Sequence, residues 1–149
     1  MRFEKKSVVV TGAGAGMGKE ITLRYLAEGA HVTAADYNVL TLRELETEVS
    51  EQEYPGELRT YVADISKREE AENLIDYAVQ EFGSLDILVN NAGVAGRCEP
   101  VGELEDELWE RVLAVNLTGT MYMMRKAVNV MLAQKSRGNI VNIASVAGL

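Results

Sequence analysis

The chain alternates short apolar runs, rich in β-branched residues, with longer amphipathic stretches, and it does so five times. This rhythm is typical of a parallel β-sheet whose two faces are covered by helices. Because β-α-β crossovers are right-handed, consecutive units extend the sheet outward until the chain crosses over to begin the other half. We therefore predict an α/β fold with a doubly wound parallel sheet and strand order 3-2-1-4-5. The five predicted strands cover residues 7–11, 31–35, 58–63, 86–90 and 139–144.

Helical spacing of apolar residues predicts the segments between these strands. The last helical region is long, from about residue 103 to 135, and contains Asn116. Asparagine is a poor helix former that competes for backbone hydrogen bonds, so we expect a bend there. The other helices are expected over about 17–28, around 42–49 and over about 67–82.

Composition narrows the class of protein. The chain has 149 residues, of which 47% are hydrophobic, and 15 basic against 23 acidic residues give a net charge of −8. This charge argues against nucleic acid or an anionic membrane surface as the main partner. One cysteine, Cys98, and one histidine, His31, leave little for a Cys/His metal site. With no long apolar segment, we expect a single cytoplasmic domain over 1–149 that neither spans nor crosses a membrane.

A glycine-rich turn follows the first predicted strand. It reads Thr-Gly-Ala-Gly-Ala-Gly-Met-Gly over 11–18 and leads into a helix. Glycines let a phosphate approach the backbone N–H groups of the helix N-terminus, whose partial positive charge favours an anion. The phosphate-binding loop of nucleotide hydrolases is excluded, since Ala13 stands where that loop needs glycine and Glu20 follows Lys19. The turn therefore predicts a pyrophosphate cradle, and a tight turn without a ligand is the alternative.

Asp36 stands at the end of the second predicted strand, eighteen residues after Gly18. An acidic side chain at this place can accept hydrogen bonds from ribose hydroxyls and would repel a 2′-phosphate. The neighbouring positions in sequence carry no Arg or Lys that could pair with such a phosphate. We therefore predict NAD rather than NADP as the cofactor, with a solvated strand-end aspartate as the alternative.

The order of these motifs resembles the short-chain dehydrogenase/reductase family. The matching segments are the cradle over 11–18, Asp64, the Asn-Asn-Ala-Gly sequence over 90–93, Asn116 and Ser145. The resemblance runs along the whole chain and implies a Rossmann-type fold and hydride transfer between NAD(H) and a secondary alcohol or ketone.

The resemblance also implies how the cofactor is held. In this family the residues matching Asp64 and Ile65 cover the adenine, and those matching Asn91, Ala92 and Gly93 line the cleft toward the nicotinamide. The residues expected to bind the cofactor are Gly12, Gly14, Ala15, Gly16, Met17, Gly18, Asp36, Asp64, Ile65, Asn91, Ala92 and Gly93.

Two further matches concern catalysis. The residue matching Ser145 hydrogen-bonds the substrate, and the one matching Asn116 holds a helix distortion and a water of the proton relay. The family's Tyr-x-x-x-Lys motif lies downstream of this serine, whereas the sequence ends at Leu149, so we expect no turnover from a chain that ends there. Tyr122 and Lys126 have the right spacing but precede Ser145, and we interpret them as a coincidence. The alternative function is a non-catalytic nucleotide-binding or regulatory module.

The long helix is apolar on more than one side. One stripe at helical spacing comprises Leu117, Met121, Met124, Val128 and Met131, and Met123, Ala127 and Val130 lie beside it. We expect the first stripe to cover the sheet and the remainder to need another helix. The sequence thus predicts a homo-oligomer through the helix over 117–131, or aggregation of a chain that ends at Leu149. The resemblance implies a small-molecule alcohol or ketone as the other partner.

Overall fold

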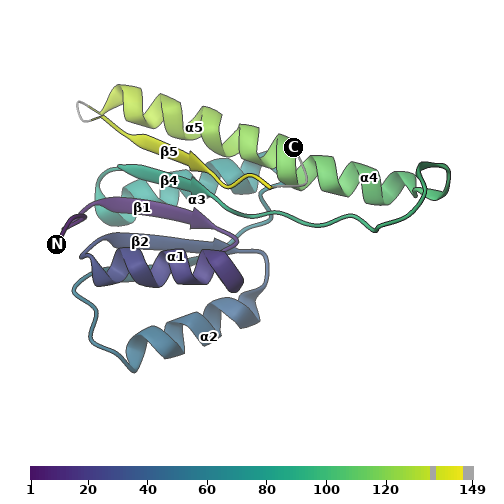
Figure 1. Ribbon diagram of the computed structural model, residues 1–149. Coiled ribbons are helices and arrows are strands. Elements are labelled where there is room, and N and C mark those ends of the chain that lie inside the picture. Colours follow the sequence, from purple (N-terminus) through teal and green to yellow (C-terminus); the bar gives the residue numbers. More distant parts are fainter. Residues whose placement is uncertain (135–136, 146–149) are drawn as a thin grey trace.

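A five-stranded parallel sheet with helices on both faces forms the fold (Figure 1). The computed structural model describes residues 1–134 and 137–145. The strand order is β3-β2-β1-β4-β5, with every neighbouring pair parallel, so the predicted fold class and order are confirmed. The elements in chain order are β1 (Ser7–Thr11), α1 (Gly16–Ala27), β2 (His31–Asp36), α2 (Val39–Ser50), β3 (Glu57–Val62), α3 (Arg68–Phe82), β4 (Ile87–Asn90), a 3₁₀ turn (Val101–Glu103), α4 (Asp106–Leu113), a π-helix (Ala114–Gly119), α5 (Thr120–Ala133) and β5 (Asn139–Asn142).

The two faces of the sheet carry separate apolar cores. Val8 and Val10 of β1 pack in the core beneath α1 and α2, and Val9 packs in the core beneath α3 and α5. All three side chains are fully buried. This alternation follows from the two-residue period of a strand, and burial on both faces explains why β1 is an unbroken apolar run.

The predicted strand boundaries shift by at most two residues, α2 begins three residues earlier than expected, and the long helical region differs more. In place of one bent helix over 103–135, α4, the π-helix and α5 follow one another from Asp106 to Ala133. The π-helix contains Asn116, so the expected bend takes the form of a locally widened turn. Of the helices described in 1–134, none has the length and apolar character needed to cross a bilayer.

The expected orientation of this helix was wrong. The side chains of α5 that are buried against the core are Met123 and Ala127, the strip expected to need another cover. Leu117, Met121 and Val128 of the other stripe are exposed, although Met131 still packs at the edge of the core. The strip that contains Met123 and Ala127 therefore covers the core, and the strip that contains Met121 and Val128 is exposed.

The chain reverses its direction of winding at β1. It adds β2 and β3 on one side, and then α3 carries it across to β4 on the other side. The connections that leave the carboxyl ends of β1 and β4 therefore diverge, which opens a crevice at this point of the sheet.

Candidate functional site

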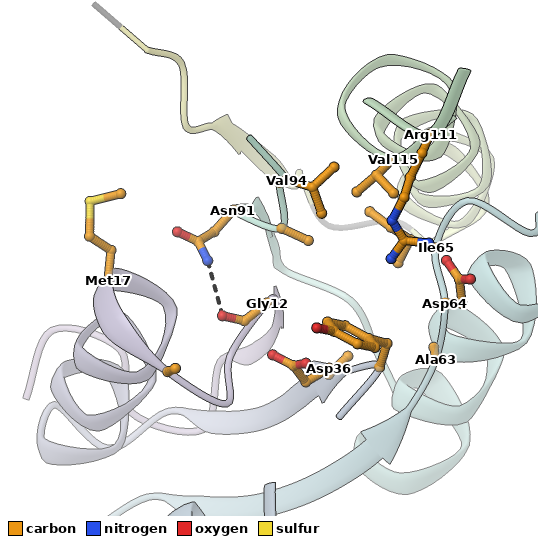
Figure 2. A pocket seen from close by; sticks show the side chains of 15 residues that line it. Gly12, Met17, Asp36, Ala63, Asp64, Ile65, Asn91, Val94, Arg111 and Val115 are labelled. Atoms are coloured by element: carbon orange, nitrogen blue, oxygen red, sulfur yellow. Dashed lines mark hydrogen bonds between the residues drawn. The ribbon is translucent and has the colours of Figure 1, made fainter. Parts of the chain in front are cut away.

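A cleft of about 280 Å³ lies at the carboxyl edge of the sheet (Figure 2). The residues predicted to bind a cofactor that line it are Gly12, Ala15, Met17, Asp36, Asp64, Ile65, Asn91, Ala92 and Gly93. Six further residues that the sequence did not single out for the site also line it: Ala35, Tyr37, Ala63, Val94, Arg111 and Val115. Gly14, Gly16 and Gly18 belong to the same glycine-rich segment and are not among the described residues that line the cleft.

The glycine-rich turn is built to bring backbone close to backbone. A Cβ on Gly18 would collide with the carbonyl oxygen of Gly12, so the start of α1 packs directly on the turn. Gly16 has a positive φ of 53°, and apart from its chain neighbours and the backbone of α1, no atom of the described residues lies within 4 Å of where its Cβ would be. The N-cap residue of α1, Ala15, makes no side-chain hydrogen bond to the start of the helix. The turn thus presents uncapped N–H groups beside open space, which suits an anion.

Asp36 ties this turn to the second strand. Its carboxylate accepts a hydrogen bond from the Gly14 N–H on one oxygen and from the Asn38 N–H on the other, both at 3.0 Å. The side chain is half-buried at the rim of the cleft. Each carboxylate oxygen can accept more than one hydrogen bond, so the group retains capacity for a ligand hydroxyl.

A second network locks β1 to β4 across the crevice. The Asn91 side-chain amide donates to the carbonyl oxygens of Thr11 (3.0 Å) and Gly12 (3.1 Å; Figure 2). The Thr11 hydroxyl oxygen in turn accepts from the backbone N–H groups of Asn91 and Ala92, both at 3.1 Å. The start of the glycine-rich turn is therefore held by the segment that follows β4.

Asp64 and Ile65 follow β3 and form another wall. Burial raises the pKa of the Asp64 carboxyl, but hydrogen bonds donated by the Ser66 hydroxyl (2.6 Å) and N–H (3.1 Å) outweigh it. The positive charges of Lys67 and Arg111 also lower the pKa of Asp64, which therefore lies below its usual value. Ile65 is only 5% exposed. The wall thus combines an ionised carboxylate with an apolar surface.

Asn116 acts as a clamp on the loop after β4. Its Oδ1 accepts from the Val94 N–H (2.8 Å), and its Nδ2 donates to the Val94 carbonyl (2.9 Å). The Thr120 hydroxyl donates to the Asn116 carbonyl at 3.0 Å, which satisfies a backbone acceptor in the distorted helix. Because Val94 lines the cleft, the π-helix fixes one of its walls.

The other predicted catalytic residue lies apart from the cleft lining. Ser145 is exposed and follows the end of β5 by three residues, and it does not line the cleft in the described part of the chain. Lys126 pairs with Asp76 of α3 at 2.7 Å, and the Tyr122 ring lies 5.4 Å from the Arg125 guanidinium. The Lys126 ion pair joins α5 to α3, whereas the Tyr122 contact lies within α5. Neither residue is among the described residues that line the cleft, which supports our interpretation of their spacing as a coincidence.

Among the described residues that line the cleft but were not singled out from the sequence, Arg111 is the charged one. It belongs to α4 and is far in sequence from the glycine-rich turn and Asp36. It extends over the cleft toward Asp64 and Ile65 (Figure 2). No local signal marks it, since a lone arginine in an exposed helix is ordinary.

Comparison with known sequences finds relatives along nearly the whole chain. The sequence profile described as short chain dehydrogenase matches residues 6–149. The chain is 42% identical over 144 residues to 3beta-hydroxysteroid dehydrogenase 2 of Eggerthella lenta, covering 97% of this chain and 55% of that protein. It is 38% identical over 143 residues to a diacetyl reductase ((S)-acetoin forming) of Staphylococcus epidermidis, covering 96% and 54%. The chain thus spans about half the length of these relatives.

Solved structures share the fold closely. A xylitol dehydrogenase with bound NAD⁺ superposes with a TM-score of 0.92 and 36% identity, covering 99% of this chain and 56% of that one. A short-chain oxidoreductase of metagenomic origin, in complex with NADP, gives a TM-score of 0.91 and 32% identity, covering 100% and 66%. Similar structures therefore include complexes with either dinucleotide.

Proposed function

The chain belongs to the short-chain dehydrogenase/reductase family, and we propose that it forms the cofactor-binding part of an oxidoreductase that prefers NAD(H) and interconverts a secondary alcohol and a ketone. The observation that carries this proposal is the Asp36 carboxylate, held at the rim of the cleft by two backbone N–H groups. Relatives named for a hydroxysteroid and for diacetyl support a small alcohol or ketone as substrate.

The cleft suits a dinucleotide along its length. The open space at Gly16 and the uncapped start of α1 fit the pyrophosphate. Asp36 would accept hydrogen bonds from the ribose hydroxyls, and Asp64 and Ile65 would border the adenine. The segment after β4, Asn91 to Gly93, would lie toward the nicotinamide. A bound nicotinamide dinucleotide supplies the hydride donor or acceptor.

The preference for NAD(H) rests on charge. The Asp36 carboxylate, held in place by two backbone N–H groups, would face a 2′-phosphate directly. The negative charges of the Asp36 carboxylate and a 2′-phosphate would repel each other strongly at close range in a partly buried site. The ribose hydroxyls of NAD(H), in contrast, could donate hydrogen bonds to this carboxylate.

The chain's own catalytic contribution is positioning. Ser145 would donate a hydrogen bond to the substrate oxygen, and Asn116 would hold the wall of the cleft through Val94. Neither group exchanges the reacting proton in this proposal. A positioned general acid or base typically raises the reaction rate by about 10²–10⁴-fold, so the group that exchanges this proton contributes strongly to the rate.

Titration of NADH and NADPH by calorimetry tests the proposal. We expect NADH to bind more tightly, and Asp36→Asn to narrow the gap about tenfold, or ~1.4 kcal/mol, since the amide keeps the shape and loses the charge. Asp106→Asn is the matched control, an exposed aspartate in the first turn of α4. Equal or tighter binding of NADPH by the unsubstituted protein overturns the proposed preference, and binding of neither dinucleotide overturns the proposed function.

We also propose a homo-oligomer formed through the outer side of the long helical region. The exposed apolar residues there lie on one face, since their spacing of four, seven and four residues follows the helical repeat. Leu117 is 64% exposed and Leu132 is 79% exposed, with Met121 and Val128 between them. Burying such a strip against the same strip of a second copy would form a two-fold symmetric contact.

A further inference from the structure

Arg111 occupies an unusual place for a surface arginine. It lies in α4, and its side chain reaches over the cleft toward the loop that holds Asp64 and Ile65 (Figure 2). Arg111 and Val115 are four residues apart and both line the cleft, so they project from one side of the helical region. The helical region therefore contributes both a cation and an apolar side chain to the end of the cleft that Asp64 and Ile65 line.

The guanidinium of Arg111 has no hydrogen-bonded or ion-pair partner among the described residues. Within residues 1–134 and 137–145 it makes no hydrogen bond and no ion pair, whereas Arg97 pairs with Glu105 at 3.4 Å and Arg125 with Glu72 at 3.3 Å. It nevertheless lies close enough to Asp64 for its charge to favour the ionised carboxylate. The guanidinium is thus attracted toward Asp64, and no hydrogen bond within the described residues occupies its donors.

The surroundings of this guanidinium suit a flat ring. Ile65 is 5% exposed and Val115 is 8% exposed, so both present little more than the surface that faces the cleft. A planar aromatic ligand packs well against aliphatic side chains, and a guanidinium stacks on aromatic faces through cation–π attraction. A lysine or a bare aliphatic residue at 111 would lack that planar surface.

We propose that Arg111 is a cofactor-binding residue that lies over the adenine ring of the dinucleotide. The proposal rests on the proposed function, since it concerns the same cleft. It assigns to α4 a direct contact with the adenosine end of the ligand. The alternative for a cation here is an ion pair with a phosphate group, which either an arginine or a lysine can make.

Binding of ADP-ribose to three variants tests this role without requiring activity. Arg111→Met keeps the length of the side chain and removes both its charge and its plane, and we expect it to weaken binding about three- to tenfold. Arg111→Lys keeps the charge and removes the plane, so its affinity should fall closer to that of Arg111→Met than to that of the unsubstituted protein. Arg125→Met is the matched control on α5 and should bind ADP-ribose unchanged.

The outcomes separate the alternatives. Affinity of Arg111→Met within twofold of the unsubstituted protein overturns the proposal, as does full retention of affinity by Arg111→Lys, which indicates a phosphate contact. A loss that is larger for 2′-phospho-ADP-ribose than for ADP-ribose also overturns it, because Arg111 would then pair with the 2′-phosphate. Thermal unfolding of Arg111→Met at the unsubstituted temperature establishes that the fold is intact. Failure of the unsubstituted protein to bind ADP-ribose refutes the dinucleotide site itself.

Discussion

The Asn91 side chain offers a sharp test of how the glycine-rich turn is held. Its amide donates two hydrogen bonds to the carbonyl oxygens of Thr11 and Gly12. Asn91→Asp is nearly isosteric but replaces the donor by an acceptor that faces two other acceptors. Asn91→Ala only deletes the two bonds and leaves the carbonyls without this partner.

The expected magnitudes follow from the two bonds. A net contribution of 0.5–1.5 kcal/mol for each predicts a loss of about 1–3 kcal/mol for Asn91→Ala. A half-buried carboxylate opposite two carbonyl oxygens adds repulsion, so Asn91→Asp should cost more, about 3 kcal/mol or above. In a domain of this size that corresponds to a melting temperature lower by about 6–12 °C.

Urea and thermal unfolding monitored by circular dichroism measure these differences. Asn73→Asp on the exposed side of α3 is the control and should change the unfolding free energy by less than about 0.5 kcal/mol. The gap between Asn91→Asp and the unsubstituted protein should narrow at low pH, because a protonated carboxyl can donate one hydrogen bond. An Asn91→Asp variant as stable as the unsubstituted protein, or more stable than Asn91→Ala, refutes the reasoning.

Three further predictions concern the rest of the molecule. Burial raises the pKa of the Asp86 carboxyl, but hydrogen bonds from the Lys6 ammonium and from the backbone outweigh it and hold the pKa below its usual value. Its stabilising effect should therefore be complete above about pH 3.9 and be lost as the pH falls through the lowered value, so unfolding free energies of Asp86→Asn should depend less on pH in that range. Met123→Ala should cost about 2–5 kcal/mol in urea unfolding, because the side chain is fully buried, whereas the exposed Met121→Ala should cost less than about 1 kcal/mol. Leu132→Lys should lower the mass found by light scattering without lowering the melting temperature, and a monomeric unsubstituted protein would contradict the proposed assembly.

The sequence by itself predicted a parallel sheet covered by helices and most of the residues that line the cleft. Alternating apolar runs indicate the parallel sheet, and right-handed crossovers are compatible with its strand order. The glycines of the turn and Asp36 could be singled out because they follow consecutive strands and must meet at one edge. These predictions needed no knowledge of side-chain contacts.

Other features were decided only by tertiary packing. Two adjacent apolar strips on the long helix are indistinguishable by periodicity, and the contact of Met123 and Ala127 with the core resolved them. The form of the distortion at Asn116 depended on its two hydrogen bonds to Val94, a residue on a distant loop. Arg111 reached the cleft because α4 and the loop after β3 meet across the sheet edge, and no pattern near Arg111 encodes that meeting. Sequence patterns indicate which side chains are apolar enough to be buried and which residues can cap a helix. The residues that each of these side chains contacts depend on which elements the completed sheet brings together.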